Sequence, residues 1–260
     1  MKAWESNIRK VEPYVPGEQP KVQDVIKLNT NENPYGPSEN VRKAMEAIDI
    51  DRCRLYPDPD VTKLVKSIAD YYGMDNNQVF VGVGSDDVLS MCFLTFFNGK
   101  KPVLFPDITY SFYSVWADLY RIPYEKQKLD DNMKIVPEDY YKENGGVIFP
   151  NPNAPTGLLM DLDSVRDIIE HNKDVVVIVD EAYIDFGGVS AKDLVNEYDN
   201  VLVVQTFSKS RSMAGMRIGY AFGSKELIKA LNDVKFSFNS YTMNMTSIDT
   251  VSYTHLRAHE

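Results

Sequence analysis

A lysine and an arginine eight residues apart are the side chains of this sequence best suited to covalent chemistry. Lys209 follows an apolar run at residues 201–204, and Arg217 lies in the glycine-containing loop beyond it. A lysine amine in a partly desolvated pocket has a lowered pKa and can form an imine with an aldehyde. The planar guanidinium of Arg217 suits a phosphate group, and Ser208 adds a hydroxyl donor. The alternative is a solvated lysine on a surface loop.

A carboxylate at the end of a second apolar run could partner a cation. Asp180 ends the run VVVIVD, which begins at residue 175. A buried carboxylate is costly unless it is paired, and the pyridinium nitrogen of pyridoxal phosphate (PLP) is a suitable partner. Tyr183, three residues later, could hydrogen-bond the phenolic oxygen of the same cofactor. The alternatives are a helix N-cap for Asp180 and core packing for Tyr183.

Two further segments could contact such a cofactor. The sequence GVGSD at residues 82–86 precedes a predicted helix over residues 88–97. Backbone N–H groups at a helix start, with glycines that allow close approach, form a cup for an anion. The alternative is a plain turn in which Ser85 or Asp86 caps the helix. Tyr110 could stack on a flat ring, with core packing as its alternative.

Short apolar runs alternate with helical segments and predict the scaffold that positions these residues. The runs are residues 79–81, 103–105, 147–149, 175–179 and 201–204. Continuous apolar runs indicate strands buried on both faces, as in a parallel sheet, and apolar spacing predicts helices within residues 39–48, 61–72 and 162–169. Polar or glycine-rich residues follow every run. Because ligands bind at the carboxyl ends of strands in open α/β sheets, the sequence predicts one site there.

The composition of the chain argues against several classes of protein. The 260 residues are 43% hydrophobic and 25% charged, with a net charge of −10. These values are typical of a globular protein, and the acidic charge argues against nucleic acid or an anionic membrane as a partner. No apolar run is long enough to span a bilayer, and residues 1–20 lack a signal-peptide core. The spacing of the two cysteines fits no metal or redox motif, which predicts a cytoplasmic protein without a metal site.

Together these motifs resemble the fold-type-I PLP-dependent aminotransferases, and more narrowly the histidinol-phosphate aminotransferase family. The matching segments are LNTNENPYGP (28–37), YPD (56–58), GSDD (84–87), PNAPTG (152–157), DEAY (180–183), SK (208–209) and RIG (217–219). The resemblance implies an α/β fold with a mainly parallel sheet flanked by helices. It divides the chain into an N-terminal arm (1–40) and a PLP-binding large domain (41–250), with the C-terminal small domain largely missing.

The resemblance also implies a role for each matching residue. Lys209 is the imine lysine, Asp180 pairs with the ring nitrogen, Tyr183 bonds the ring oxygen and Tyr110 stacks on the ring. The residues that hold the cofactor phosphate are Gly84, Ser85, Asp86, Ser208 and Arg217.

One implied contact crosses a subunit boundary, and another departs from the family pattern. Tyr56 would reach the phosphate of the neighbouring subunit, which implies a homodimer. The family reads Asn-Asn-Pro-Thr-Gly, and the second asparagine contacts the ring oxygen. That position is Ala154 here, so we assign the contact to Asn153.

The implied reaction is the transamination of L-histidinol phosphate with 2-oxoglutarate in histidine biosynthesis. Two alternatives stay open. One is another PLP reaction on the same scaffold, such as threonine-phosphate decarboxylation or transamination of a different amino acid. The other is an inactive PLP-binding fragment, because the family's substrate-clamping arginine lies in the small domain.

The last ten residues, VSYTHLRAHE (251–260), depart from the family pattern. They contain two of the three histidines of the chain, where the family has an amphipathic helix that leads to the small domain. We interpret the segment as a non-native tail that resembles a translated cloning or sequencing adapter. The alternative is a divergent but genuine helix.

Overall fold

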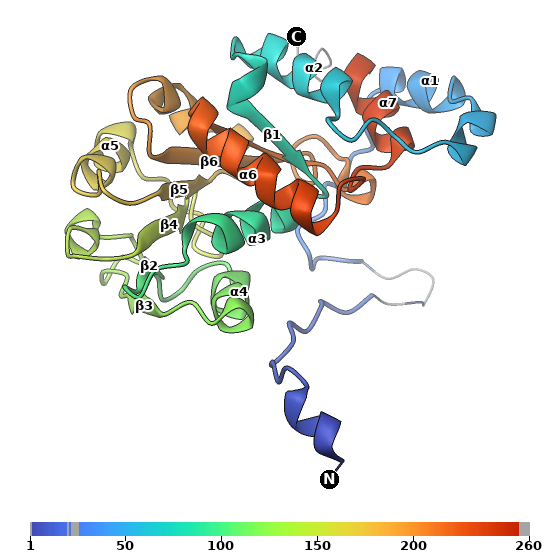
Figure 1. The fold of residues 1–260 in the computed structure, drawn as a ribbon. Coiled ribbons are helices and arrows are strands. Elements are labelled where there is room, and N and C mark those ends of the chain that lie inside the picture. The colour runs from blue at the N-terminus through green and yellow to red at the C-terminus, as the bar shows by residue number, and fades with distance from the viewer. Residues whose placement is uncertain (1, 20, 22–25, 255–260) are drawn as a thin grey trace.

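Seven short strands form a single sheet in the computed structural model, which describes residues 2–19, 21 and 26–254 (Figure 1). The order across the sheet is β1-β7-β6-β5-β4-β2-β3. Only β7 runs antiparallel to its neighbours, β1 and β6. The strands are β1 (Val79–Gly82), β2 (Val103–Pro106), β3 (Tyr124–Gln127), β4 (Gly146–Pro150), β5 (Val177–Asp180), β6 (Val201–Thr206) and β7 (Gly219–Gly223).

Successive side chains of the central strands enter two separate apolar layers. In β4, Val147 and Phe149 join one cluster, whereas Ile148 joins the other. Because alternate side chains of a strand point to opposite faces, both faces must be covered, and this explains the continuous apolar runs. The helices α2 (Thr62–Tyr72) and α5 (Leu162–Glu170) contribute to the first cluster. The second cluster receives α3 (Ser85–Phe96), α4 (Phe112–Tyr120) and α6 (Lys225–Phe238).

The helix α2 also packs with two further helices at the β1 side of the sheet (Figure 1). In this group α7 (Met245–Thr254) contacts both α1 (Glu39–Glu46) and α2. Asp249 of α7 forms ion pairs with Arg52 at 3.1 Å and with Lys63 at 2.9 Å. Val251 is fully buried in the first apolar cluster. The predicted boundary at residue 250 therefore falls inside a helix, and residues 255–260 of the predicted tail lie outside the described residues.

The N-terminal arm contains little regular structure in its described part. One short 3-10 helix, η1 (Ala3–Asn7), lies near its start, and the arm extends away from the sheet (Figure 1). Residues 30–33 return to the carboxyl edge of the sheet, where Asn33 hydrogen-bonds the backbone of Lys209. None of the described helices has both the length and the apolar character required to cross a bilayer.

The predicted fold class is confirmed, and two strands were not predicted. The five apolar runs correspond to β1, β2, β4, β5 and β6. The strand β3 has the sequence YEKQ and lies at the sheet edge, so only one residue of it is buried. The strand β7, GYAFG, is short and begins and ends with glycine, a residue that is depleted in strands. The strand β7 is stabilised by hydrogen bonds to β1 and β6, and its local sequence alone does not predict it.

Candidate active site

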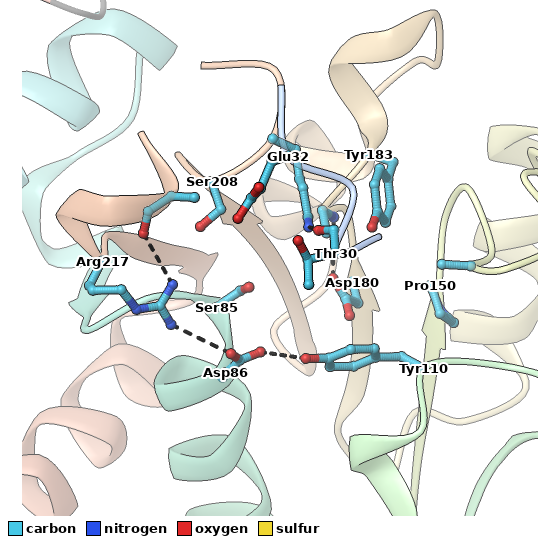
Figure 2. A pocket seen from close by; sticks show the side chains of 14 residues that line it. Thr30, Glu32, Ser85, Asp86, Tyr110, Pro150, Asp180, Tyr183, Ser208 and Arg217 are labelled. Carbon is cyan, nitrogen blue, oxygen red and sulfur yellow. Dashed lines mark hydrogen bonds and ion pairs between the residues drawn. The ribbon is translucent and has the colours of Figure 1, made fainter. Parts of the chain in front are cut away.

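A cavity of about 230 Å³ lies at the carboxyl ends of β4, β5 and β6 (Figure 2). Pro150 and Asp180 end β4 and β5, and Ser208 follows β6. Parallel strands place their carboxyl ends at one edge of the sheet, so residues distant in the sequence meet there. Eight of the predicted site residues line the cavity: Ser85, Asp86, Tyr110, Asp180, Tyr183, Ser208, Lys209 and Arg217.

Asp180 is a buried carboxylate with two hydrogen-bond donors. Its side chain accepts a hydrogen bond from the Tyr113 hydroxyl at 2.8 Å and another from the Ala182 backbone N–H at 3.2 Å. Burial raises the pKa of Asp180 to about 6, although both hydrogen bonds favour the ionised form and the charge of Asp86 opposes it. None of the ion pairs among the described residues involves Asp180. The carboxylate therefore faces the cavity without a cationic partner from the described chain.

The helix-cap alternative for Asp180 does not match the local structure. The segment after β5 forms a short 3-10 helix, η5 (Ile184–Phe186), whose N-cap position is Tyr183. The hydrogen bond from the Ala182 N–H to Asp180 belongs to the turn that precedes this helix.

Lys209 is held against the N-terminal arm. Its Nζ atom donates a hydrogen bond to the carbonyl oxygen of Thr30 at 2.8 Å and lies 5.6 Å from the centroid of the Tyr183 ring. Asn33 Nδ2 donates to the carbonyl oxygens of Lys209 and Ser210, at 3.2 Å in each case. The amine is thus oriented by backbone and aromatic groups, and it lines the same cavity as Asp180.

Arg217 and the start of α3 form the opposite end of the cavity (Figure 2). Arg217 Nη2 lies 3.5 Å from a carboxylate oxygen of Asp86. Gly84 has a φ of +88°, and a Cβ atom there would lie 2.5 Å from Arg217 Nη2. A side chain at this position would therefore displace the guanidinium. Ser85 begins α3, so the free backbone N–H groups of the first turn point toward this end.

Tyr110 joins the two ends of the cavity. Its hydroxyl donates a hydrogen bond to Asp86 at 2.7 Å. Burial and the neighbouring charge of Asp86 raise the pKa of Tyr110, so the phenol stays protonated at neutral pH. The ring also packs against Phe112 and Trp116, so the cavity wall and the aromatic core share this side chain.

The structure does not bring Asn153 to the cavity, and its predicted contact with the ring oxygen is corrected. Asn153 is 2% exposed, and its Nδ2 atom donates to the Ile108 carbonyl oxygen at 3.1 Å and to Thr156 Oγ1 at 3.3 Å. Its Oδ1 atom accepts a hydrogen bond from the Thr109 hydroxyl at 3.0 Å. The amide thus ties two loops together, and the apolar side chain of Ala154 lines the cavity instead.

Tyr56 also lies outside the cavity lining. Its side chain is 80% exposed and stacks on Tyr241, with ring centroids 4.6 Å apart. An exposed aromatic pair of this kind is available to a neighbouring subunit. The predicted contact across the subunit boundary stays a prediction.

Several residues at the site were not assigned a role from the sequence. Tyr113 lies three residues after Tyr110, and its backbone N–H donates to the Tyr110 carbonyl oxygen at 3.3 Å across the start of α4. This spacing was the available signal. Thr30 and Glu32 line the cavity from the arm. No local pattern relates the arm to β6, because the contact from Thr30 to Lys209 spans 179 residues.

Comparison with known proteins gives concordant matches. The family described as aminotransferase class I and II matches residues 23–256. Histidinol-phosphate aminotransferase from Clostridium beijerinckii is 54% identical over 247 residues, which cover 95% of this chain and 69% of that protein. Histidinol-phosphate aminotransferase from Clostridium botulinum (strain Hall) is 56% identical over 246 residues, which cover 95% of this chain and 70% of that protein.

A solved structure supports the same fold. The crystal structure of histidinol-phosphate aminotransferase from Sinorhizobium meliloti in complex with pyridoxal-5'-phosphate has a TM-score of 0.78, at 20% identity, over 86% of this chain and 62% of that chain. The chain spans 69–70% of the length of the two Clostridium relatives. From the family match and these identities, the chain belongs to the class I and II aminotransferases, within the family of the histidinol-phosphate aminotransferases.

Proposed function

We propose that this chain catalyses the PLP-dependent transfer of an amino group from L-histidinol phosphate to an oxo acid, as a step of histidine biosynthesis. The observation that carries the proposal is the placement of the Lys209 amine and the buried Asp180 carboxylate in one cavity. Both Clostridium relatives are named histidinol-phosphate aminotransferases, and their 54–56% identity over 95% of this chain supports the same substrate.

The residues around Asp180 and Lys209, at the end of the cavity away from Arg217, fit the ring of PLP. The Asp180 carboxylate is buried without a cationic partner from the described chain, and a protonated ring nitrogen would supply one. Tyr183 would donate a hydrogen bond to the ring oxygen, and Tyr110 would stack on the ring. Lys209 would hold the cofactor covalently as a Schiff base.

The residues at the other end fit a phosphate group. Arg217 offers a guanidinium fork, and the hydroxyl groups of Ser85 and Ser208 lie at the same end of the cavity (Figure 2). Asp86 would contribute its backbone N–H from the first turn of α3. Gly84 leaves the space that the guanidinium occupies.

The chemistry follows from the positions of Lys209 and Asp180. When bound, PLP supplies an electron sink for the negative charge that develops at the α-carbon of the substrate. Once the substrate amine has displaced it from the cofactor, Lys209 Nζ would take the proton from that carbon and pass it to the cofactor. The Thr30 carbonyl oxygen orients the amine. Asp180 keeps the positive charge on the ring nitrogen, and burial strengthens this pairing.

Borohydride reduction of the PLP-loaded chain, followed by peptide mapping, tests the assignment of Lys209. We expect one reduced adduct, on Lys209, and none in the Lys209→Ala variant. A label on a different lysine would refute the assignment.

Product analysis with L-histidinol phosphate and with threonine phosphate separates the activities, because transamination yields a carbonyl product and decarboxylation releases carbon dioxide. An adduct without either product would identify an inactive PLP-binding chain.

We also propose that the active form is a homodimer in which Tyr56 reaches the phosphate of the other subunit. The exposure of Tyr56 and its stacking on Tyr241 support this role. Mixing Lys209→Ala and Tyr56→Phe proteins tests it, since hybrid dimers would contain one site without either substitution. Recovery of activity after subunit exchange is expected, and no recovery after verified exchange would count against the shared site.

The amino acceptor and the cellular location are further parts of the proposal. We propose 2-oxoglutarate as the acceptor, and glutamate formation in the assay would test this choice. We propose a cytoplasmic location, which is supported by the two free thiols of Cys53 and Cys92. Cell fractionation with an antibody against the chain would test the location.

A further inference from the structure

The N-terminal arm places an amide on the hydroxyl group of Tyr183. Asn31 Nδ2 donates a hydrogen bond to Tyr183 Oη at 2.9 Å, across 152 residues of sequence. We propose that Asn31 is a positioning residue that orients the Tyr183 phenol and strengthens it as a donor into the cavity. The inference rests on the proposed function, because the group that would receive the Tyr183 hydrogen bond is the ring oxygen of PLP.

Among the described residues that line the cavity, no asparagine or glutamine side chain is available to donate a hydrogen bond to Tyr183 in place of Asn31. Ala154 presents a methyl group to the cavity, and the amide of Asn153 is occupied by Ile108, Thr109 and Thr156. Asn31 thus supplies from the arm the amide that residues 153 and 154 do not supply.

Three further hydrogen bonds hold this part of the arm in place. The Thr30 carbonyl oxygen accepts from Lys209 Nζ at 2.8 Å, and Asn33 Nδ2 donates to the carbonyl oxygens of Lys209 and Ser210 at 3.2 Å. Thr30 and Asn31 have φ values of +63° and +51°, so the backbone turns sharply here. Such a conformation is uncommon for residues other than glycine, which indicates that the surrounding contacts impose it. Figure 2 shows the side chains of Thr30 and Glu32 between Ser208 and Tyr183.

The hydrogen bond from Asn31 has a defined direction. Because the Tyr183 oxygen accepts from Asn31 Nδ2, the phenolic proton is left free to be donated to another acceptor. Hydrogen bonds in such a chain polarise one another, so a phenol that accepts a hydrogen bond is a stronger donor. The position of the arm therefore affects how strongly the Tyr183 hydroxyl donates a hydrogen bond.

The consequence is a lowered pKa of the imine formed by Lys209. A donor to the ring oxygen stabilises negative charge there, and it does so most when the imine nitrogen carries no proton. A stronger Tyr183 donor therefore favours the unprotonated imine. Loss of the Asn31 amide should raise the imine pKa by roughly half to one unit, which corresponds to one hydrogen bond of ordinary strength.

The experiment compares Asn31→Ala with a matched control and a rescue variant, each loaded with PLP. An absorbance titration reports the protonation of the imine without turnover. We expect Asn31→Ala to raise the imine pKa and Ala154→Asn in the same chain to lower it again. The control is Asn29→Ala, because the Asn29 amide donates to the Glu18 carbonyl oxygen within the arm. An equal shift in the control, no shift in Asn31→Ala, or no rescue by Ala154→Asn would overturn the inference.

Hydrogen–deuterium exchange on the cofactor-free protein provides a second readout. Loss of the contact should speed exchange in the peptide that contains residues 30–33, and unchanged exchange in Asn31→Ala would also overturn the inference. An imine that forms with an unaltered pKa in Asn31→Ala refutes the role of Asn31 and leaves the proposed function intact. No imine in the unmodified chain refutes the proposed function, and the exchange experiment still decides the contact.

Discussion

Replacement of Tyr113 by phenylalanine tests whether one hydroxyl group controls the charge of Asp180. Tyr113 is fully buried, and its hydroxyl donates a hydrogen bond of 2.8 Å to the Asp180 carboxylate. This bond favours the ionised carboxylate against the effect of burial. Phenylalanine keeps the ring and its packing but removes the donor. We therefore expect Tyr113→Phe to raise the pKa of Asp180 further.

The magnitude follows from the two opposing effects. A hydrogen bond to a charged group contributes about 1.5–3 kcal/mol, and one pKa unit corresponds to about 1.4 kcal/mol. The pKa of Asp180 should therefore rise by roughly one to two units above its present value of about 6. In the unmodified chain, the rise from 3.8 to about 6 means that ionised Asp180 costs the folded state about 3 kcal/mol.

The sign of the pH dependence is set by this raised pKa. The folded state binds the Asp180 proton more tightly than the unfolded state. The contribution of Asp180 to stability is therefore greatest below about pH 3.8 and is lost as the pH rises through about 6. In Tyr113→Phe the loss should continue to roughly pH 7–8, because the folded-state pKa is higher. Asp180→Asn has no such titration and provides the reference.

The assay is urea unfolding of the cofactor-free protein between pH 4 and pH 8, as a double-mutant cycle of Tyr113→Phe and Asp180→Asn. Glu181 also titrates in this range, because burial raises its pKa to about 7, but it is present in every variant and cancels in the differences. The reasoning fails if Tyr113→Phe and the unmodified chain lose stability over the same pH range. It also fails if the free-energy difference between the unmodified chain and Asp180→Asn does not change with pH.

Three further substitutions and one control substitution test the packing of the chain by urea unfolding. Gly219→Ala would place a Cβ atom 2.3 Å from the backbone N of Ser85, so we expect the free energy of unfolding to fall by about 1–3 kcal/mol and the Kd for PLP to rise. Gly215→Ala is the control: its Cβ atom would have no neighbouring atom within 4 Å, and neither quantity should change. Arg211→Leu removes a buried guanidinium that lies 5.0–6.0 Å from the centroids of four aromatic rings, and we expect a loss of about 2–4 kcal/mol. Val251→Ala should cost about 1–3 kcal/mol if α7 packs as described, and no loss would support a non-native segment from residue 251.

Local patterns in the sequence determined five of the seven described strands and eight of the residues that line the cavity. The runs that became β4, β5 and β6 are apolar throughout because both faces of these strands are covered. Parallel strands bring their carboxyl ends to one edge, so Asp180 at the end of β5 and Lys209 after β6 had to lie near each other. This reasoning needs only the strand positions and the polarity of the residues that follow them.

Only the tertiary structure decided which side chain faces the cavity and which groups pair across long separations. The turn after β4 directs the Asn153 amide toward Ile108 and leaves Ala154 at the cavity, an orientation that residue type alone does not specify. The hydrogen bond from Tyr113 to Asp180 spans 67 residues, and the bond from Asn31 to Tyr183 spans 152. Local propensity sets strands and helices over a few residues, whereas such partners are set by the packing of whole layers, which depends on the entire chain.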